Sequence, residues 1–125
     1  MKLLLDSHTY LWWLADDPLL STAARTAIAD PRNTVLVSAA TIWELEIKRA
    51  LGRLHVGDAD LVAEITENGF GEVPVRASHA VAAAGLPPHH ADPFDRMLVA
   101  QSRADGLVCV TRDPAFDAYG AVTLW

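Results

Sequence analysis

Leu3-Leu4-Leu5-Asp6-Ser7-His8 is the stretch that sets the fold, because three leucines are followed at once by polar residues. A short apolar run is typical of a strand covered on both faces, as in a parallel sheet. We therefore predict a strand over residues 2–5 that ends at Asp6. In such sheets the functional crevice lies beyond the carboxyl ends of the strands, so Asp6 is the first candidate for a site residue.

Strands and helices alternate along the rest of the chain. Further strands are predicted at residues 34–37, 73–75, 107–110 and 122–124. Helices are predicted at residues 8–16, 21–28, 38–51, 58 or 60 to 68, 78–84 and 92–105, with a turn or short helix at 113–119. Pro74 places the strand at 73–75 at an edge, because proline cannot donate to a ladder. The alternation predicts an α/β fold in which a mainly parallel sheet of about five strands lies between two layers of helices.

Composition is that of a globular protein. The chain has 125 residues, 51% apolar and 21% charged, which predicts a single domain over residues 1–125. Ten basic and sixteen acidic residues give a net charge of −6, which argues against a broad basic surface for nucleic acid. A nuclease stays compatible with this charge, because a bound cation restores local attraction for phosphate.

Cellular location is indicated by two features. Cys109 is the only cysteine, so no disulfide forms within the chain, and its apolar surroundings indicate an inert thiol. Asp6 interrupts the apolar start, and no apolar run approaches the roughly 18 residues of a membrane span. We expect a cytoplasmic protein that does not associate with membranes.

Four carboxylates fall where the predicted elements meet. Asp6 ends the first strand, Asp113 follows the strand at 107–110, Asp95 lies in the first turn of a helix, and Glu44 lies in the helix after the second strand. Hard divalent cations prefer oxygen ligands, and magnesium takes one or two carboxylates together with water and phosphate. A bound cation activates water and stabilises a leaving oxygen. The four residues therefore predict a catalytic cation site.

Each of the four carboxylates also has an ordinary structural interpretation, and spacing alone leaves both interpretations open. The structural alternatives are Asp6 as a helix N-cap, Asp95 in a capping box with Asp92, Glu44 as the surface partner of Lys48, and Asp113 as a turn residue before Pro114.

The motifs resemble those of the PIN-domain ribonucleases, and among them the VapC-type toxins of bacterial toxin–antitoxin systems. The matching segments are Leu3 to His8, Val37 to Glu44, His89 to Gln101, and Val110 to Asp113 with Phe116. The resemblance implies a PIN-like three-layer α/β/α sandwich over residues 1–125. It also implies a ribonuclease that needs Mg²⁺, with Mn²⁺ as the alternative.

Residue roles follow from the same resemblance. Asp6, Glu44, Asp95 and Asp113 would form the catalytic and metal-binding set, with Asp6 and Asp95 as direct ligands. Thr111 would orient a ligand or water. Candidates for RNA contact are few: Arg96, Arg112, Lys48 and Arg49.

The resemblance further implies a toxin that inhibits translation by cutting RNA, with a VapB-like antitoxin as its partner. We also expect a homodimer, because the apolar bulk around Trp12 and Trp13 exceeds what one narrow helix face hides.

The alternative to a ribonuclease is a catalytically inactive PIN-like protein-interaction module. A phosphatase with an Asp nucleophile would need a second Asp where His8 stands. The adjacent His89 and His90 are open between a metal role with Asp92, a substrate loop and a structural role.

Overall fold

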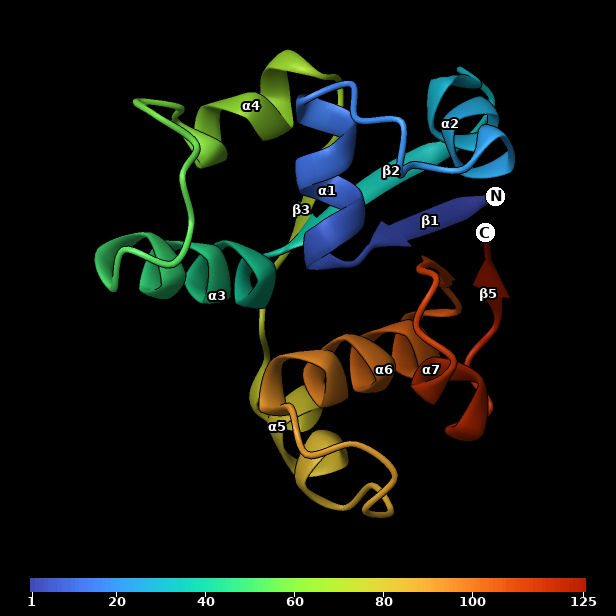
Figure 1. Cartoon of the computed structure of the whole chain (residues 1–125). Coiled ribbons are helices and arrows are strands. Elements are labelled where there is room, and N and C mark those ends of the chain that lie inside the picture. Colours follow the sequence, from blue (N-terminus) through green and yellow to red (C-terminus); the bar gives the residue numbers. More distant parts are fainter.

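Five parallel strands form the central sheet of the computed structural model, which describes all 125 residues (Figure 1). The strands are β1 (Lys2–Leu5), β2 (Thr34–Ser38), β3 (Gly71–Val73), β4 (Val108–Val110) and β5 (Thr123–Leu124). Their order is β3-β2-β1-β4-β5, and every neighbouring pair is parallel. The order reverses between β1 and β4. The predicted α/β sheet is thereby confirmed, and its switch point, the usual place of a functional crevice, lies at these two strands.

Seven helices connect and cover the strands. They are α1 (Ser7–Leu14), α2 (Thr22–Ala29), α3 (Ala39–Ala50), α4 (Leu61–Glu67), α5 (Ala77–Ala84), α6 (Pro93–Asp105) and α7 (Ala115–Ala118). None of them is both long and apolar enough to cross a bilayer.

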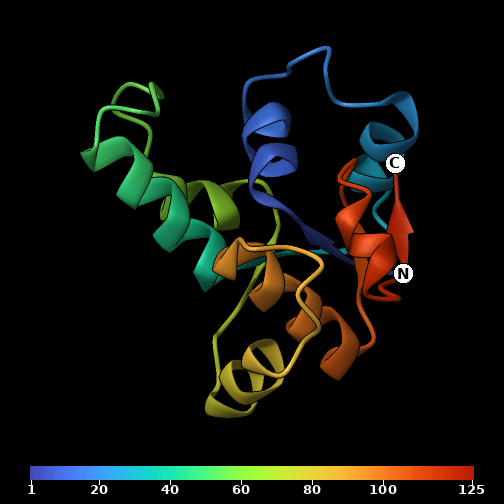
Figure 2. The same ribbon diagram turned by 60° about the horizontal axis from the view of Figure 1, so that its bottom comes forward.

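Alternate leucines of β1 supply two separate cores. Leu3 and Leu5 pack with side chains of α1, α2, α3 and α4, whereas Leu4 packs with side chains of α6 and α7. Successive side chains of a strand point to opposite faces, so the two cores lie on the two sides of the sheet. Figure 2 shows α5 and α6 on the side away from α1 and α2. The three-layer α/β/α arrangement is confirmed.

The third strand lies earlier in the chain than its sequence pattern indicated. The prediction of residues 73–75 was wrong in its bounds, because β3 covers Gly71–Val73 and ends before Pro74. Pro74 has no N–H to continue the ladder. Gly71 lies close to β2, since a Cβ at this position would come within 2.9 Å of Leu36 Cδ2. The predicted edge position is confirmed by the strand order.

The start of α6 follows its sequence signals. Asp92 is the N-cap, Pro93 occupies the first turn, and Gly106 ends the helix in the left-handed conformation with φ 66°. These are the residues that the capping rules favour. The helix therefore presents Asp95, in its first turn, at the carboxyl edge of the sheet. Cys109 is buried in β4, and burial raises its pKa to about 11, so the thiol stays protonated.

Candidate active site

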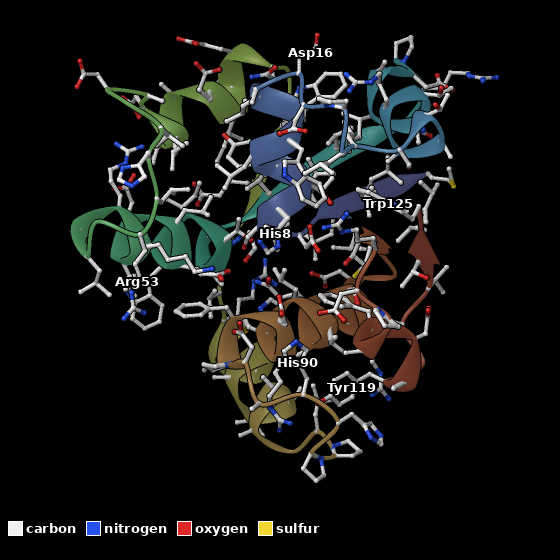
Figure 3. All side chains as sticks on the ribbon, viewed as in Figure 1. His8, Asp16, Arg53, His90, Tyr119 and Trp125 are labelled. Carbon is white, nitrogen blue, oxygen red and sulfur yellow. The ribbon has the colours of Figure 1, made fainter.

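A cleft of about 360 Å³ opens at the carboxyl ends of the central strands. Figure 3 shows His8 of α1 and His90, which precedes α6, on the two sides of a region into which polar side chains converge. The carboxylates that line the cleft are Asp6, Glu44, Asp92, Asp95 and Asp113. The structure thus brings together all four predicted residues and adds Asp92.

Asp6 is both a helix cap and a cleft residue. Its side chain is the N-cap of α1, where Oδ1 accepts a hydrogen bond of 2.8 Å from the Thr9 N–H. Its Oδ2 accepts a hydrogen bond of 2.6 Å from the Thr111 hydroxyl. The two interpretations of Asp6 therefore do not exclude each other, because capping holds the carboxylate in place at the cleft. The Thr111 hydroxyl thereby fixes the direction of the Asp6 carboxylate.

Glu44 faces inward rather than toward solvent. Its residue exposure is 5%, so its interpretation as a solvated surface partner was wrong, although Lys48 does pair with it at 2.8 Å. The Ser7 hydroxyl donates to the other carboxylate oxygen. The sequence analysis missed Ser7, because no local pattern joins residue 7 to residue 44. Both contacts fix the direction of the Glu44 carboxylate.

Asp92 and Asp95 lie three residues apart, but their side chains have different structural roles. Asp92 Oδ1 accepts hydrogen bonds from the N–H groups of Phe94 and Asp95, at 2.8 and 3.3 Å. The Asp92 N–H donates to His90 Nδ1, so Asp95 does not complete a capping box. Asp92 therefore caps α6, and the Asp95 carboxylate is left to face the cleft.

Among the cleft carboxyl groups, Asp95 is the one whose pKa is raised by its surroundings. Burial, together with the negative charges of Asp92, Glu44 and Asp6, raises the pKa of the Asp95 carboxyl to about 7, and His90 opposes this shift. Crowded carboxylates resist ionisation unless a cation lies between them. The donor set consists of oxygens, which suits Mg²⁺ or Mn²⁺. The residues present therefore fit a hard divalent cation.

Asp113 lies at the more exposed margin of the cleft. Its side chain is 36% exposed, and its Oδ1 accepts a hydrogen bond of 2.9 Å from the Ala115 N–H at the start of α7. Its own N–H donates to Thr111 Oγ1 at 3.0 Å. Thr111 therefore links the Asp6 carboxylate to the backbone of Asp113, because its hydroxyl also donates to Asp6.

Two basic side chains reach the cleft, one from α3 and one from the loop after β4. Lys48 and Arg112 line it, and the Arg112 guanidinium lies 4.5 Å from the centre of the Trp12 ring. Arg96 is directed elsewhere, because its guanidinium donates to backbone carbonyls at the end of α5 and in the loop before α6. Arg49 binds the Ala59 carbonyl. Of the four candidates for RNA contact, Lys48 and Arg112 are therefore the ones placed at the cleft.

Aromatic residues lie beside the cleft and also away from it. Trp12 stacks with His8 at 5.4 Å between ring centres, and Trp13 packs against Phe70; both tryptophans are half-buried. Trp43 of α3 is the most exposed of the four tryptophans, at 65%. The largest exposed aromatic surface thus lies on α3, where the sequence analysis did not expect it.

Together, the fold and the cleft define a class of α/β protein with an acidic site at the switch point of a parallel sheet. The chain belongs to the PIN domain family, whose family model matches residues 3–122. It is 30% identical over 128 residues to ribonuclease VapC22 of Mycobacterium tuberculosis, an alignment that covers 98% of this chain and 97% of the relative.

Solved structures share the fold at low sequence identity. A VapBC2 complex from Rickettsia felis, bound to a DNA fragment from their promoter, matches with a TM-score of 0.74 and 12% identity over 99% of this chain and 98% of that one. FitAcB from Neisseria gonorrhoeae matches with a TM-score of 0.58 and 18% identity, covering 98% and 96%. These likenesses confirm the PIN-like fold.

Proposed function

We propose that this chain is a metal-dependent ribonuclease that hydrolyses phosphodiester bonds of RNA. One observation carries the proposal: five carboxylates from four segments of the chain line one cleft at the switch point of the sheet. The similarity to ribonuclease VapC22 over nearly the whole of both chains supports it.

Asp6, Glu44, Asp95 and Asp113 are the residues that would hold the cation, which we propose to be Mg²⁺ or, alternatively, Mn²⁺. When bound, such a cation lowers the pKa of its water and stabilises the leaving oxygen of a phosphodiester. The protein's own groups orient the carboxylates: Thr111 holds Asp6, and Ser7 with Lys48 holds Glu44. Arg112 would bind an RNA phosphate at the rim of the cleft, since a guanidinium matches phosphate geometry.

Incubation of the purified chain with total RNA tests this function. We expect mapped cleavage sites to appear with Mg²⁺ or Mn²⁺ and to vanish in chelator. An RNA pool that stays intact with both cations would contradict the proposal. The mapped sites would also identify the RNA that is cut.

A change at Thr111 tests how the carboxylates are oriented. Thr111→Val keeps the size of the side chain and removes the hydroxyl that donates to Asp6, so we expect cleavage to fall by about 10- to 100-fold. Thr123→Val is the matched control, because that hydroxyl binds Asp117 outside the cleft. Equal rates for the two variants would contradict a role for Thr111 in holding Asp6.

We further propose that the chain is the toxin of a toxin–antitoxin pair that inhibits translation in the cytoplasm. Its inhibitor would be a VapB-like antitoxin. The proposal rests on the similarity to a VapC ribonuclease. The net charge of −6 also favours the binding of a basic peptide that would cover the acidic cleft.

A homodimer is part of the same proposal, and its surface is expected on α3. Trp43 is 65% exposed and borders an apolar groove formed with Val75, Phe94 and Met97. Exposed aromatic patches mark interfaces.

We expect sedimentation at micromolar concentration to show a dimer that Trp43→Asp converts to a monomer. Leu19→Asp, at an exposed leucine in the loop between α1 and α2, is the control, and a monomeric wild type would contradict the dimer.

A further inference from the structure

Three flat side chains lie against one another along one wall of the cleft. His8 and Trp12 share a face of α1, because residues four apart in a helix are neighbours. Their rings stack at 5.4 Å between centres, with 29° between the ring planes. The Arg112 guanidinium, from the loop after β4, lies 4.5 Å from the centre of the Trp12 ring. All three residues line the same cleft as the carboxylates.

Arg112 lies against the Trp12 ring rather than against a carboxylate. The basic side chains within ion-pair distance of cleft carboxylates are Lys48, at 2.8 Å, and His90, at 3.0 and 3.3 Å, and Arg112 forms no such pair. The face of an indole ring attracts a cation, which accounts for the position of the guanidinium. Its N–H groups therefore remain available to an anionic ligand.

Trp12 is held from the protein side, whereas His8 is open to solvent (Figure 3). The Trp12 ring is half-buried, packs against the apolar core that contains Leu3 and Leu5, and contacts the Trp125 ring at 5.8 Å. His8 is exposed and stacks on this fixed ring, so its imidazole presents an uncovered face at the edge of the cleft. The wall therefore offers a flat ring and a free cation side by side.

We propose that His8, Trp12 and Arg112 form a nucleotide subsite, in which a base stacks on the His8 imidazole and the Arg112 guanidinium binds a phosphate. This inference rests on the proposed ribonuclease function and deepens it. Unpaired bases of RNA stack on aromatic side chains, histidine included, and this stacking tolerates every base. The subsite would fix the RNA strand beside the scissile phosphodiester. Purines would be preferred there, because their larger rings cover more of the imidazole.

Equilibrium binding of a fluorescent RNA octamer of adenosines tests the subsite. Ca²⁺ replaces Mg²⁺ in the assay, since it also takes oxygen ligands, and electrophoresis checks that the RNA stays intact. His8→Ala should weaken binding about tenfold, because the stacking of one base is lost. His8→Phe keeps a flat ring without nitrogens and should bind within about twofold of the wild type. His89→Ala is the matched control, because His89 also lies against an aromatic ring, that of Tyr119, but outside the cleft.

An octamer that keeps the phosphates and lacks the bases separates stacking from phosphate binding. The wild type should bind this abasic probe about tenfold more weakly than the adenosine octamer, whereas His8→Ala should bind both probes with similar affinity. Arg112→Gln should weaken the binding of both probes to a similar degree. It should also lower the dependence of affinity on salt, because one phosphate contact is lost.

The subsite would be overturned by a wild type that binds no octamer, by unchanged binding in His8→Ala, or by an equal loss in His8→Ala and His8→Phe. RNA cleavage with unchanged kinetics in His8→Ala would also overturn it and would leave the ribonuclease function standing. A chain that binds the probes as expected but cuts no RNA with Mg²⁺ or Mn²⁺ would contradict the ribonuclease function and support the subsite.

Discussion

Asp95→Asn is expected to abolish RNA cleavage by the purified chain. Asparagine has nearly the shape of aspartate, but it lacks the charge that binds a cation at the centre of the cleft. The loss should exceed about 100-fold, the upper range for residues that only support metal ligands. Asp6→Asn should have a similar effect on cleavage, since Asp6 lines the same cleft.

Initial cleavage rates with saturating Mg²⁺ provide the measurement, with circular dichroism to check the fold. Asp58→Asn is the matched control, because Asp58 is exposed and lies in the loop before α4. A variant at Asp95 that keeps more than a tenth of the wild-type rate would contradict the assignment of this residue. It would leave the fold and the family unaffected.

Asp95→Asn should also stabilise the cation-free protein at pH 7.5. The folded chain raises the pKa of Asp95 to about 7, above the ordinary carboxyl value of 3.8, mainly because the group is buried. Between these two values the unfolded chain has released the proton and the folded chain retains it, so stability falls as pH rises from about 4 to about 7. The loss at pH 7.5 is at most about 4 kcal/mol. This loss of stability is absent in Asp95→Asn, because the asparagine side chain does not ionise.

Thermal unfolding in chelator at pH 4.5 and at pH 7.5 measures this effect. The melting temperature of Asp95→Asn should exceed that of the wild type by several degrees at pH 7.5, with a smaller difference at pH 4.5. Asp6→Asn should gain less, because the substitution disturbs the hydrogen bonds that the Asp6 carboxylate accepts from Thr9 and Thr111. A lower melting temperature for Asp95→Asn at pH 7.5 would contradict a crowded acidic cleft.

Local sequence patterns were sufficient to predict the α/β architecture. The apolar run before Asp6 and the β-branched run at 34–37 indicated buried strands, and Asp92-Pro93 with Gly106 marked both ends of α6. These features depend on backbone hydrogen bonding and side-chain periodicity within about a dozen residues. The carboxyl ends of parallel strands share one edge, so the positions of Asp6 and Asp113 at the cleft also followed from sequence.

Tertiary structure alone decided how the cleft is held together. Ser7 of α1 donates to the inward-facing Glu44 of α3, and the His90 imidazole, before α6, lies 3.3 Å from the Asp113 carboxylate, which follows β4. These two contacts join residues from distant segments, so they follow from strand pairing and helix packing. The sequence by itself determined which side chains arrive at the edge of the sheet, and packing between segments determined where each of them points.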